Sequence, residues 1–335
     1  INNIKGVNMK NIKKVGLSAL AGSLVAFSAN AVDMSVTGTA EVTYTTNGGT
    51  NSNTGNPFGS NTSLKFSGSG DVGFGTATIV RTINDSLGSA YLSAYTTLDM
   101  GDMGTLSHDA IGGGLEGTAA NDDILPTAYE EVWNDISGTG VLGAASNDTI
   151  GYSNTIMGAT ISLATTKGGT GASADGKNDG EGVTSHISDW HVKTPVPYVD
   201  GLTIAYGQSK TEFAISSEND DTSMVGHILY NMGPASLGYR IAEQQDGSNG
   251  SNGLNVEAYA VAFNLNDEMS VSLATQDTEY DVPSGTNVTE TVDAVNASYT
   301  VGAASVRATF SESDNDGGQT GDTDEHMELS LVLSF

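Results

Sequence analysis

The charged side chains of this sequence fall into two groups that differ in their setting. Carboxylates gather in the interval 108–146, which has no regular patterning, whereas several cations stand singly between apolar neighbours. Carboxylates on one side of a water-filled space and cations on the other would create a transverse electric field. A solvated loop surface is the alternative for the carboxylates. The candidate carboxylates are Glu116, Asp122, Asp123, Glu130, Glu131 and Asp135, and the candidate cations are Lys65, Arg81, Arg240 and Arg307.

The sequence lacks the spacings that catalysis or metal binding needs. Its five histidines are scattered without metal-ligand spacing, and it has no Gly-x-Ser-x-Gly motif for a nucleophilic serine. The stretch 314–325 resembles a calcium-binding loop, but Gln319 occupies the place that needs glycine, so a solvated loop is favoured. We therefore predict no enzyme activity, no catalytic residue, no metal and no cofactor.

The elements that would position these charges are strands. The last nine residues, 327–335, alternate between apolar and polar side chains, and a period of two is typical of a strand with one apolar face. This strand closes a membrane barrel with its apolar face in lipid, or it is the last strand of a soluble sandwich. The apolar face consists of Met327, Leu329, Leu331, Leu333 and Phe335.

The start of the chain has the three parts of a secretory signal. Residues 1–8 precede the first plausible start, Met9, and we exclude them as non-structural. Lysines follow Met9, then an apolar run over 15–27 and the small residues Ala29 and Ala31 of a cleavage site. We predict a signal peptide over 9–31 and a single domain over 32–335. An uncleaved anchor is the alternative, but the apolar run is too short to span a bilayer.

The charge balance excludes several classes of partner. The first 31 residues hold four of the 12 basic residues and none of the 40 acidic ones, so the remaining chain carries eight basic residues against 40 acidic ones. Nucleic acid is therefore not an expected partner. The absence of cysteine means that an exported chain has no disulfides to brace it.

Alternating segments recur along the whole chain and predict sixteen strands. Seven short turns alternate with eight longer loops, which is the layout of an outer-membrane barrel wide enough to hold water. Side chains alternate between the two faces of a strand, so Lys65, Arg240 and Arg307 lie on the face opposite to their apolar neighbours. We therefore expect these three side chains to point toward water. Arg81 lies in a poorly patterned strand, but a cation facing lipid costs about 2–4 kcal/mol, so we expect it inside as well.

Four features accompany this strand layout: VTGTA at 36–40, DMGTL at 102–106, NDTIGYS at 147–153 and the terminal Phe335. With them the chain resembles the Gram-negative general diffusion porins. The resemblance implies a sixteen-stranded trimer whose third long loop, 108–146, folds into the lumen, and it implies that Phe335 belongs to the signal read by the barrel-assembly machinery. The Pro-Glu-Phe/Tyr-Gly-Gly pattern of that loop is missing here, and 125–131 stands in its region. The middle of the loop, 124–133, is a candidate for a short helix folded against the molecule.

We therefore predict an all-β antiparallel transmembrane barrel in the outer membrane of a Gram-negative bacterium. It would pass small hydrophilic solutes and ions passively, and it would prefer cations because twenty of the forty acids lie in the eight long loops. Its expected partners are outer-membrane lipid, two further copies in a homotrimer and the assembly machinery. The alternatives are a substrate-selective channel, a secreted acidic β-rich adhesin, and an outer-membrane enzyme, which would need a clustered nucleophile and base.

Overall fold

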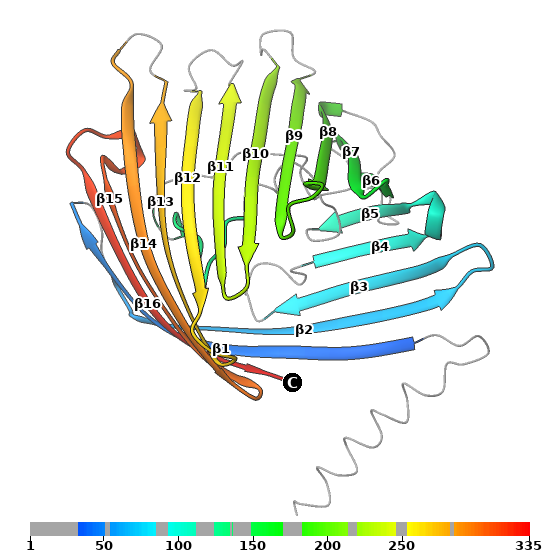
Figure 1. The fold of residues 1–335 in the computed structure, drawn as a ribbon, viewed down its shortest axis with the longest axis horizontal. Helices are drawn as coiled ribbons and strands as arrows, with labels where there is room; N and C mark the ends of the chain where they lie inside the picture. The colour runs from blue at the N-terminus through cyan, green and yellow to red at the C-terminus, as the bar shows by residue number, and fades with distance from the viewer. Residues whose placement is uncertain are drawn as a thin grey trace, which may run out of the picture.

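The chain forms one closed antiparallel barrel of sixteen strands (Figure 1). The computed structural model describes residues 33–50, 54–84, 93–111, 124–134, 136, 149–169, 183–213, 220–245, 253–281 and 285–335. Each strand pairs with its neighbours in sequence, and the first pairs with the last, so the predicted barrel is confirmed. The strands are β1 (Asp33–Gly49), β2 (Phe58–Asp71), β3 (Thr76–Asn84), β4 (Ser93–Asp99), β5 (Thr105–Ile111), β6 (Thr149–Ile156), β7 (Ala159–Gly169), β8 (Val183–Pro195), β9 (Leu202–Phe213), β10 (Asp221–Met232), β11 (Ala235–Gln245), β12 (Leu254–Asn264), β13 (Met269–Tyr280), β14 (Val288–Val301), β15 (Ala304–Asp314) and β16 (Thr323–Ser334).

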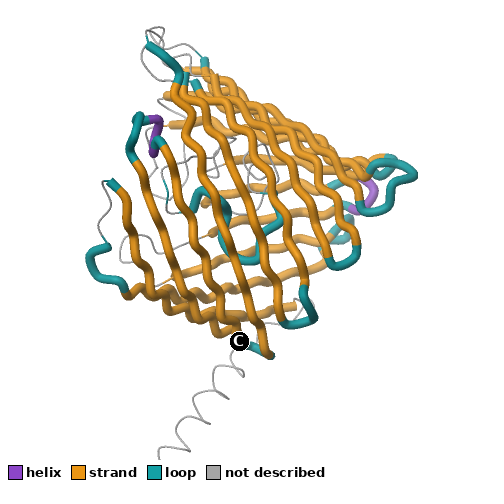
Figure 2. Tube along the Cα trace, turned by 60° about the vertical axis from the view of Figure 1, so that its left-hand side comes forward, coloured by secondary structure: helices purple, strands orange, loops and turns teal. Residues whose placement is uncertain are grey.

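The connections alternate between short turns and longer loops, as predicted. Seven connections have two to six residues, and the eight that alternate with them have seven or more. The β6–β7 turn consists of Met157 and Gly158 with φ of 53° and 85°, which is the backbone of a tight hairpin that follows strand twist. The β14–β15 turn places Gly302 at φ 60°. The strands wind around the barrel at a tilt (Figure 2). Because consecutive strands are antiparallel, the short turns lie at one rim and the strand ends that lead into the longer loops lie at the other.

The outer face of the barrel is apolar. One unbroken cross-strand row runs from β11 to β16; Val261 in it is half-buried, and each of the other side chains is 41–55% exposed. The row consists of Leu237, Val261, Leu273, Val295, Phe310 and Met327. Such a continuous exposed apolar surface is what lipid, not water, stabilises.

The inner face is polar and largely buried, whereas the buried face of a strand in a soluble protein is apolar. Polar side chains at most 3% exposed line it, and they lie on the parity opposite to the apolar row. They include Ser272, Gln276, Thr278, Asn296, Ser311 and Ser330. Buried polar groups need hydrogen-bond partners, so the interior must hold polar contacts or water.

The first and last strands meet at the closing seam. Strand β1 pairs with β16 in an unshifted register from Thr39 opposite Ser334 to Gly49 opposite Asp324. Phe335 continues the ladder, since its N–H lies 2.9 Å from the Gly38 oxygen and its own oxygen lies 2.7 Å from the Gly38 nitrogen. A Cβ on Gly38 would lie 2.6 Å from the Phe335 ring, so the glycine makes room for the terminal aromatic. The terminal strand predicted from alternation is confirmed.

Helical structure in the described residues is limited to short 3₁₀ turns such as η1 (Gly101–Met103) and η3 (Asp316–Gly318). Residues 124–134 form bends and one turn, in which the Asn134 N–H lies 3.2 Å from the Glu131 oxygen. The short helix considered for 124–133 is therefore wrong. Among the helices in these parts of the chain, none has both the length and the apolar character to cross a membrane.

Candidate functional site

The loop between β5 and β6 enters the barrel and packs on its inner wall. Its described part, 124–134 and 136, is here called the docked segment. Gly238 of β11 allows the closest approach, because a Cβ there would lie 2.4 Å from the Pro126 ring and 2.8 Å from Leu125. The predicted inward fold of the third long loop is confirmed for this part.

Two polar wall residues bind the backbone of the docked segment. The Ser272 hydroxyl accepts the Ala128 N–H at 2.9 Å. The Asn296 amide donates to the Glu130 oxygen at 3.0 Å and accepts its N–H at 3.3 Å, so both of its polar atoms hold the loop. Ser272 is 3% and Asn296 1% exposed, so these bonds are shielded from competing water.

An apolar contact adds to these bonds. Val132 and Ile136 pack against Val292 and Ala294 of β14, with Trp133 at the edge of the cluster. All four aliphatic side chains are at most 7% exposed. The docked segment covers Val292 and Ala294, which is why this part of the inner wall is apolar.

Two arginines of the wall face aromatic rings of the docked segment. The Arg240 guanidinium lies 4.6 Å from the Trp133 ring centre and donates to the Gln276 oxygen at 2.6 Å, and Arg240 is fully buried. The Arg307 guanidinium lies 5.5 Å from the Tyr129 ring centre. A desolvated cation–π contact such as that of Arg240 contributes about 2 kcal/mol, and the contact of the half-buried Arg307 contributes less. The two arginines therefore anchor the loop.

The Tyr129 hydroxyl joins the loop to the closing seam. It donates to the Glu328 carboxylate of β16 and lies 3.4 Å from the Glu41 carboxylate of β1. Burial, and then the hydrogen bond to Glu328, raise the pKa of Tyr129 above its usual value, so the phenol remains a donor. Thr45 and Ser330 donate to the same two carboxylates. The docked segment thus extends from the carboxylates of Glu41 and Glu328 to the buried Arg240.

The predicted carboxylates of the loop are only partly within the described residues. Glu130 and Glu131 belong to the docked segment and are half-buried, whereas Glu116, Asp122, Asp123 and Asp135 lie outside the described residues. No group of three or more metal-ligating side chains gathers in the parts of the chain described above.

The register places three of the four predicted cations on the inner face. Lys65 pairs with Thr37 and Thr82, and Arg240 and Arg307 face the docked segment. The inward orientation expected for Arg81 is wrong, because Arg81 pairs with Phe66 on the outer face.

The reason for the exception is local. The Arg81 guanidinium donates to the backbone oxygens of Val80 at 2.6 Å and Tyr95 at 3.1 Å, beside a register shift in β4. These bonds partly satisfy the cation. The expectation of an inward side chain treated the cation as fully exposed to lipid.

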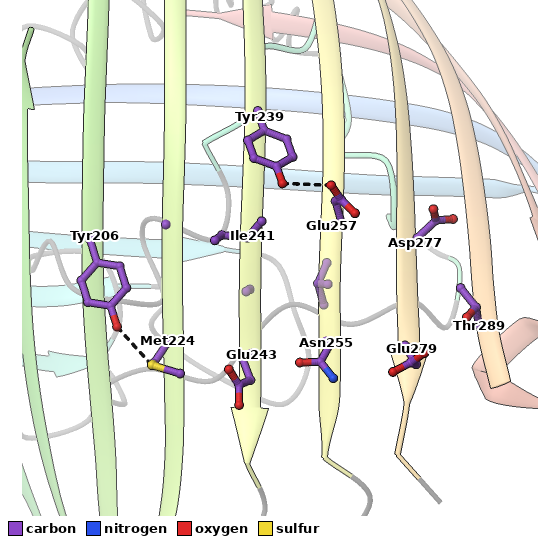
Figure 3. A pocket seen from close by; sticks show the side chains of 13 residues that line it. Tyr206, Met224, Tyr239, Ile241, Glu243, Asn255, Glu257, Asp277, Glu279 and Thr289 are labelled. Carbon is purple, nitrogen blue, oxygen red and sulfur yellow. Dashed lines mark hydrogen bonds between the residues drawn. The ribbon is translucent and has the colours of Figure 1, made fainter. Parts of the chain in front are cut away.

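A separate hollow lies on the outside of the barrel, near the long-loop ends of β9–β13 (Figure 3). It has a volume of about 580 Å³. Its apolar part includes Tyr206, Met224 and Ile241, and carboxylates such as Glu257 and Glu279 border it. The hydroxyls of Tyr239 and Tyr259 both donate to Glu257, so tyrosines mark the boundary between the apolar band and the charged rim.

Sequence reasoning missed the residues that matter most here. Tyr129 and Trp133 were not singled out, nor were Glu41, Glu328 and Asn296. Parity contained a signal for the two glutamates, because each stands between outward apolar side chains. Nothing local to 124–136 indicates which wall residues it contacts.

Comparisons with known proteins place this architecture among the porins. Neither a family profile nor a curated protein sequence matches the chain. The anion-selective porin from Comamonas acidovorans superposes with a TM-score of 0.65 and 14% identity, covering 91% of this chain and 100% of its own. OmpF of Salmonella typhi, in complex with daunomycin, gives 0.65 and 11%, covering 91% and 98%. A mutant of the Rh. blastica porin gives 0.58 and 12%, covering 91% and 100%.

These likenesses show the fold. The chain has the sixteen-stranded barrel of the Gram-negative general porins, as the resemblance implied, and this is the architecture of an outer-membrane, multi-pass β-barrel.

Proposed function

We propose that this protein is an outer-membrane porin, a water-filled channel through which small hydrophilic solutes and ions diffuse passively, without a catalysed reaction. The observation that carries the proposal is the combination of an apolar outer face, a polar inner face and a loop docked along the inner wall. A loop held on one side narrows a sixteen-stranded barrel without filling it. The porin architecture of the structural neighbours supports the proposal.

We further propose that the channel prefers cations. The wall arginines Arg240 and Arg307 face aromatic rings, which partly screen them from the lumen. Glu41 and Glu328 accept hydrogen bonds from hydroxyl groups, which carry no positive charge to offset a carboxylate. Glu130 and Glu131, together with the acids predicted on the same loop, add to this excess of negative charge.

The outer face of β3–β5 supports a homotrimer. Arg81 lies there, and Thr96 and His108 share one cross-strand row on the same face. A cation facing lipid near mid-membrane costs about 2–4 kcal/mol, so contact with another copy of the chain would stabilise this face. We expect the detergent-solubilised protein to have the mass of three chains by light scattering, and Arg81→Glu to reduce it to one. Lys65→Glu, on the inner face, is the control; a monomeric parent protein would contradict the proposal.

Biogenesis is part of the same proposal. The Phe335 side chain is 70% exposed on the outer face at the closing seam, where the assembly machinery would read it. The proposed signal peptide, 9–31, lies outside the described residues. Outer-membrane lipid is the partner proposed for the apolar row.

The test is planar-bilayer conductance of the purified, refolded chain under a KCl gradient. We expect large stepwise openings with a linear current–voltage relation and a cation-selective reversal potential. Anion selectivity would contradict the preference but leave the porin proposal standing. A protein that stays soluble without detergent and gives no openings would contradict the porin proposal and favour the secreted adhesin.

A further inference from the structure

The loop between β15 and β16, residues 315–322, folds toward the inside of the barrel and is here called the mouth loop. It contacts Tyr280 at the end of β13 and Glu290 near the start of β14. Alternation places Glu290 on the same face as Val292, which packs against the docked segment. It places Tyr280 on the face of Gln276, which binds Arg240. The mouth loop therefore lies against the lumen side of the wall.

Hydrogen bonds hold the mouth loop on this wall. The Gly317 N–H donates to one oxygen of the Glu290 carboxylate at 3.3 Å, and the Tyr280 hydroxyl donates to the other at 2.8 Å. The Asn315 amide donates to the Thr289 backbone oxygen at 2.9 Å. Glu290 is fully buried, so the bonds to its carboxylate are shielded from water. A buried carboxylate without donors would be costly, so Glu290 favours the state in which the loop is docked.

The mouth loop is also closed by bonds of its own. The Asp316 N–H donates to the Asp322 oxygen at 3.1 Å, and the Gly318 N–H donates to the Asn315 oxygen at 2.9 Å. The Gly321 N–H donates to the Asn315 side-chain oxygen at 2.9 Å. Asn315 itself has a φ of 59°, a left-handed conformation that asparagine adopts more readily than most residues. Because these bonds join both ends of the loop, the contacts with the wall position all of it.

The mouth loop and the docked segment lie in succession along β14. This strand begins at Val288, but its pairing with β15 begins only at Thr291, opposite Asp314. The inner face of β14 therefore extends past the end of β15, and the loop packs against that extension. Glu290 is one alternation nearer to the long-loop rim than Val292, which contacts the docked segment. A solute that enters from that rim would pass the mouth loop first.

The charge of the mouth loop is negative. Its eight residues include Asp316 and Asp322 and no basic residue. Both aspartates are half-buried, so part of each side chain reaches water. Asp316 and Asp324 lie close enough to Glu290 to act on it electrostatically, so carboxylates from the loop and the wall gather at this point. Fixed negative charge beside a water-filled passage attracts cations.

We propose that the mouth loop is a second constriction of the channel, held on the inner wall by Glu290 and Tyr280, and that Asp316 selects cations there. The inference rests on the proposed channel function and deepens it. Part of the selectivity then lies outside the docked segment, at the entrance to the pore. A permeating ion passes two loops in series, and the first discriminates by charge.

An introduced disulfide tests the position and the effect of the mouth loop. The chain contains no cysteine, so a pair of new cysteines has no competing thiol. A Cβ on Gly318 would lie 3.3 Å from the Cβ of Tyr280, close to the separation of about 3.5–4.5 Å in disulfides. In Gly318→Cys/Tyr280→Cys we expect the disulfide to form in the refolded barrel, with the conductance of the parent protein. Reduction in the bilayer should increase the conductance, because it releases a loop that also lacks the Tyr280 hydroxyl.

Tyr280→Cys alone is the control, and reductant should not change its conductance. Thiol titration measures the disulfide independently of conductance, and heat-modifiable gel migration shows that the barrel folds. A folded double variant that forms no disulfide would overturn the docked position of the loop. A disulfide whose reduction leaves the conductance unchanged would overturn the constriction, while KCl openings would still support the porin. Absence of openings in the parent protein would overturn the channel, and the constriction with it.

The charge is tested by Asp316→Asn, which keeps an acceptor for the Ser313 hydroxyl. We expect the cation-over-anion permeability ratio from reversal potentials to fall about twofold, the effect of one unit charge across about 8 Å of water. Asp314→Asn is the matched control, because Asp314 lies two positions away and is exposed on the outer face of β15. An unchanged ratio in Asp316→Asn, or an equal decrease in Asp314→Asn, would overturn the role of Asp316.

Discussion

Neighbouring stretches of the inner wall place cations on the same face but give them different neighbours. On β11 and β15, Arg240 and Arg307 contact the rings of Trp133 and Tyr129. On β8, Lys193 shares the wall with His191 and His227, over the small residues of β9. The first pair anchors a loop, whereas in the second group His191 and His227 are at most 3% exposed. Parity places a cation on a wall, but only its tertiary neighbours decide what it does there.

The largest expected effect comes from removing the ring over Arg240. Trp133→Ala deletes a large packed side chain, which typically costs about 3–5 kcal/mol, and uncovers a buried charge. We expect a lower urea midpoint for unfolding and a larger single-channel conductance, because the docked segment loses its anchor.

Trp190→Ala is the matched control for this change. Trp190 is the other tryptophan of the chain, and it lies on the outer face of β8 at 39% exposure. Conductance should be unchanged in that variant. Equal conductance in Trp133→Ala and the parent protein would show that Arg240 and Trp133 do not hold the loop.

A medium effect is expected from crowding the loop instead of releasing it. In Gly238→Ala the new methyl group would lie 2.4 Å from Pro126, and overpacking of this kind costs about 1–3 kcal/mol. We expect the docked segment to shift into the lumen or off the wall, so conductance should change measurably in bilayers.

The neighbouring strand provides the control for crowding. In Gly226→Ala the nearest atom would lie 3.5 Å away, an ordinary contact, so the current should match that of the parent protein. Identical behaviour of the two alanine variants would mean that the close approach at Gly238 does not set the position of the loop.

The smallest change in conductance is expected at the hydroxyl of Tyr129, where the effect is on stability. Tyr129→Phe keeps the ring beside Arg307 but removes the hydrogen bond to Glu328, which costs about 1.5–3 kcal/mol. Because the pKa of Tyr129 is raised in the folded state, the parent protein should lose stability as the pH rises above about 10, where the unfolded tyrosine ionises.

The phenylalanine variant should lack that part of the alkaline loss. Urea unfolding at pH 8 and pH 11 measures it, with Tyr198→Phe as the control, because Tyr198 lies fully exposed in the turn between β8 and β9. A stability difference between the parent and Tyr129→Phe that stays the same at both pH values would contradict the proposed protonated phenol.

Most of the barrel could be predicted from the sequence, but little of the path of the loop between β5 and β6 could. Alternation is a local property, so residues such as Leu329 and Lys65 were assigned to the correct faces without knowledge of their partners. Arg81 was misplaced because its strand alternates poorly and because an energetic argument replaced the pattern. The contact of Tyr129 with Glu328 joins residues 199 positions apart, and no pattern within either segment encodes it.

The closing seam also determines when the barrel is able to form. Thr45 and Glu328 are bonded neighbours although they are 283 positions apart, and the ladder between β1 and β16 includes the last residue of the chain. Ordering so long an intervening chain before this ladder forms makes folding slow, as is general for structures dominated by distant pairings. Until the ladder forms, both edge strands present unpaired backbone and apolar side chains to any other chain nearby. Safe folding therefore requires that the chain be protected from aggregation until β16 has paired with β1.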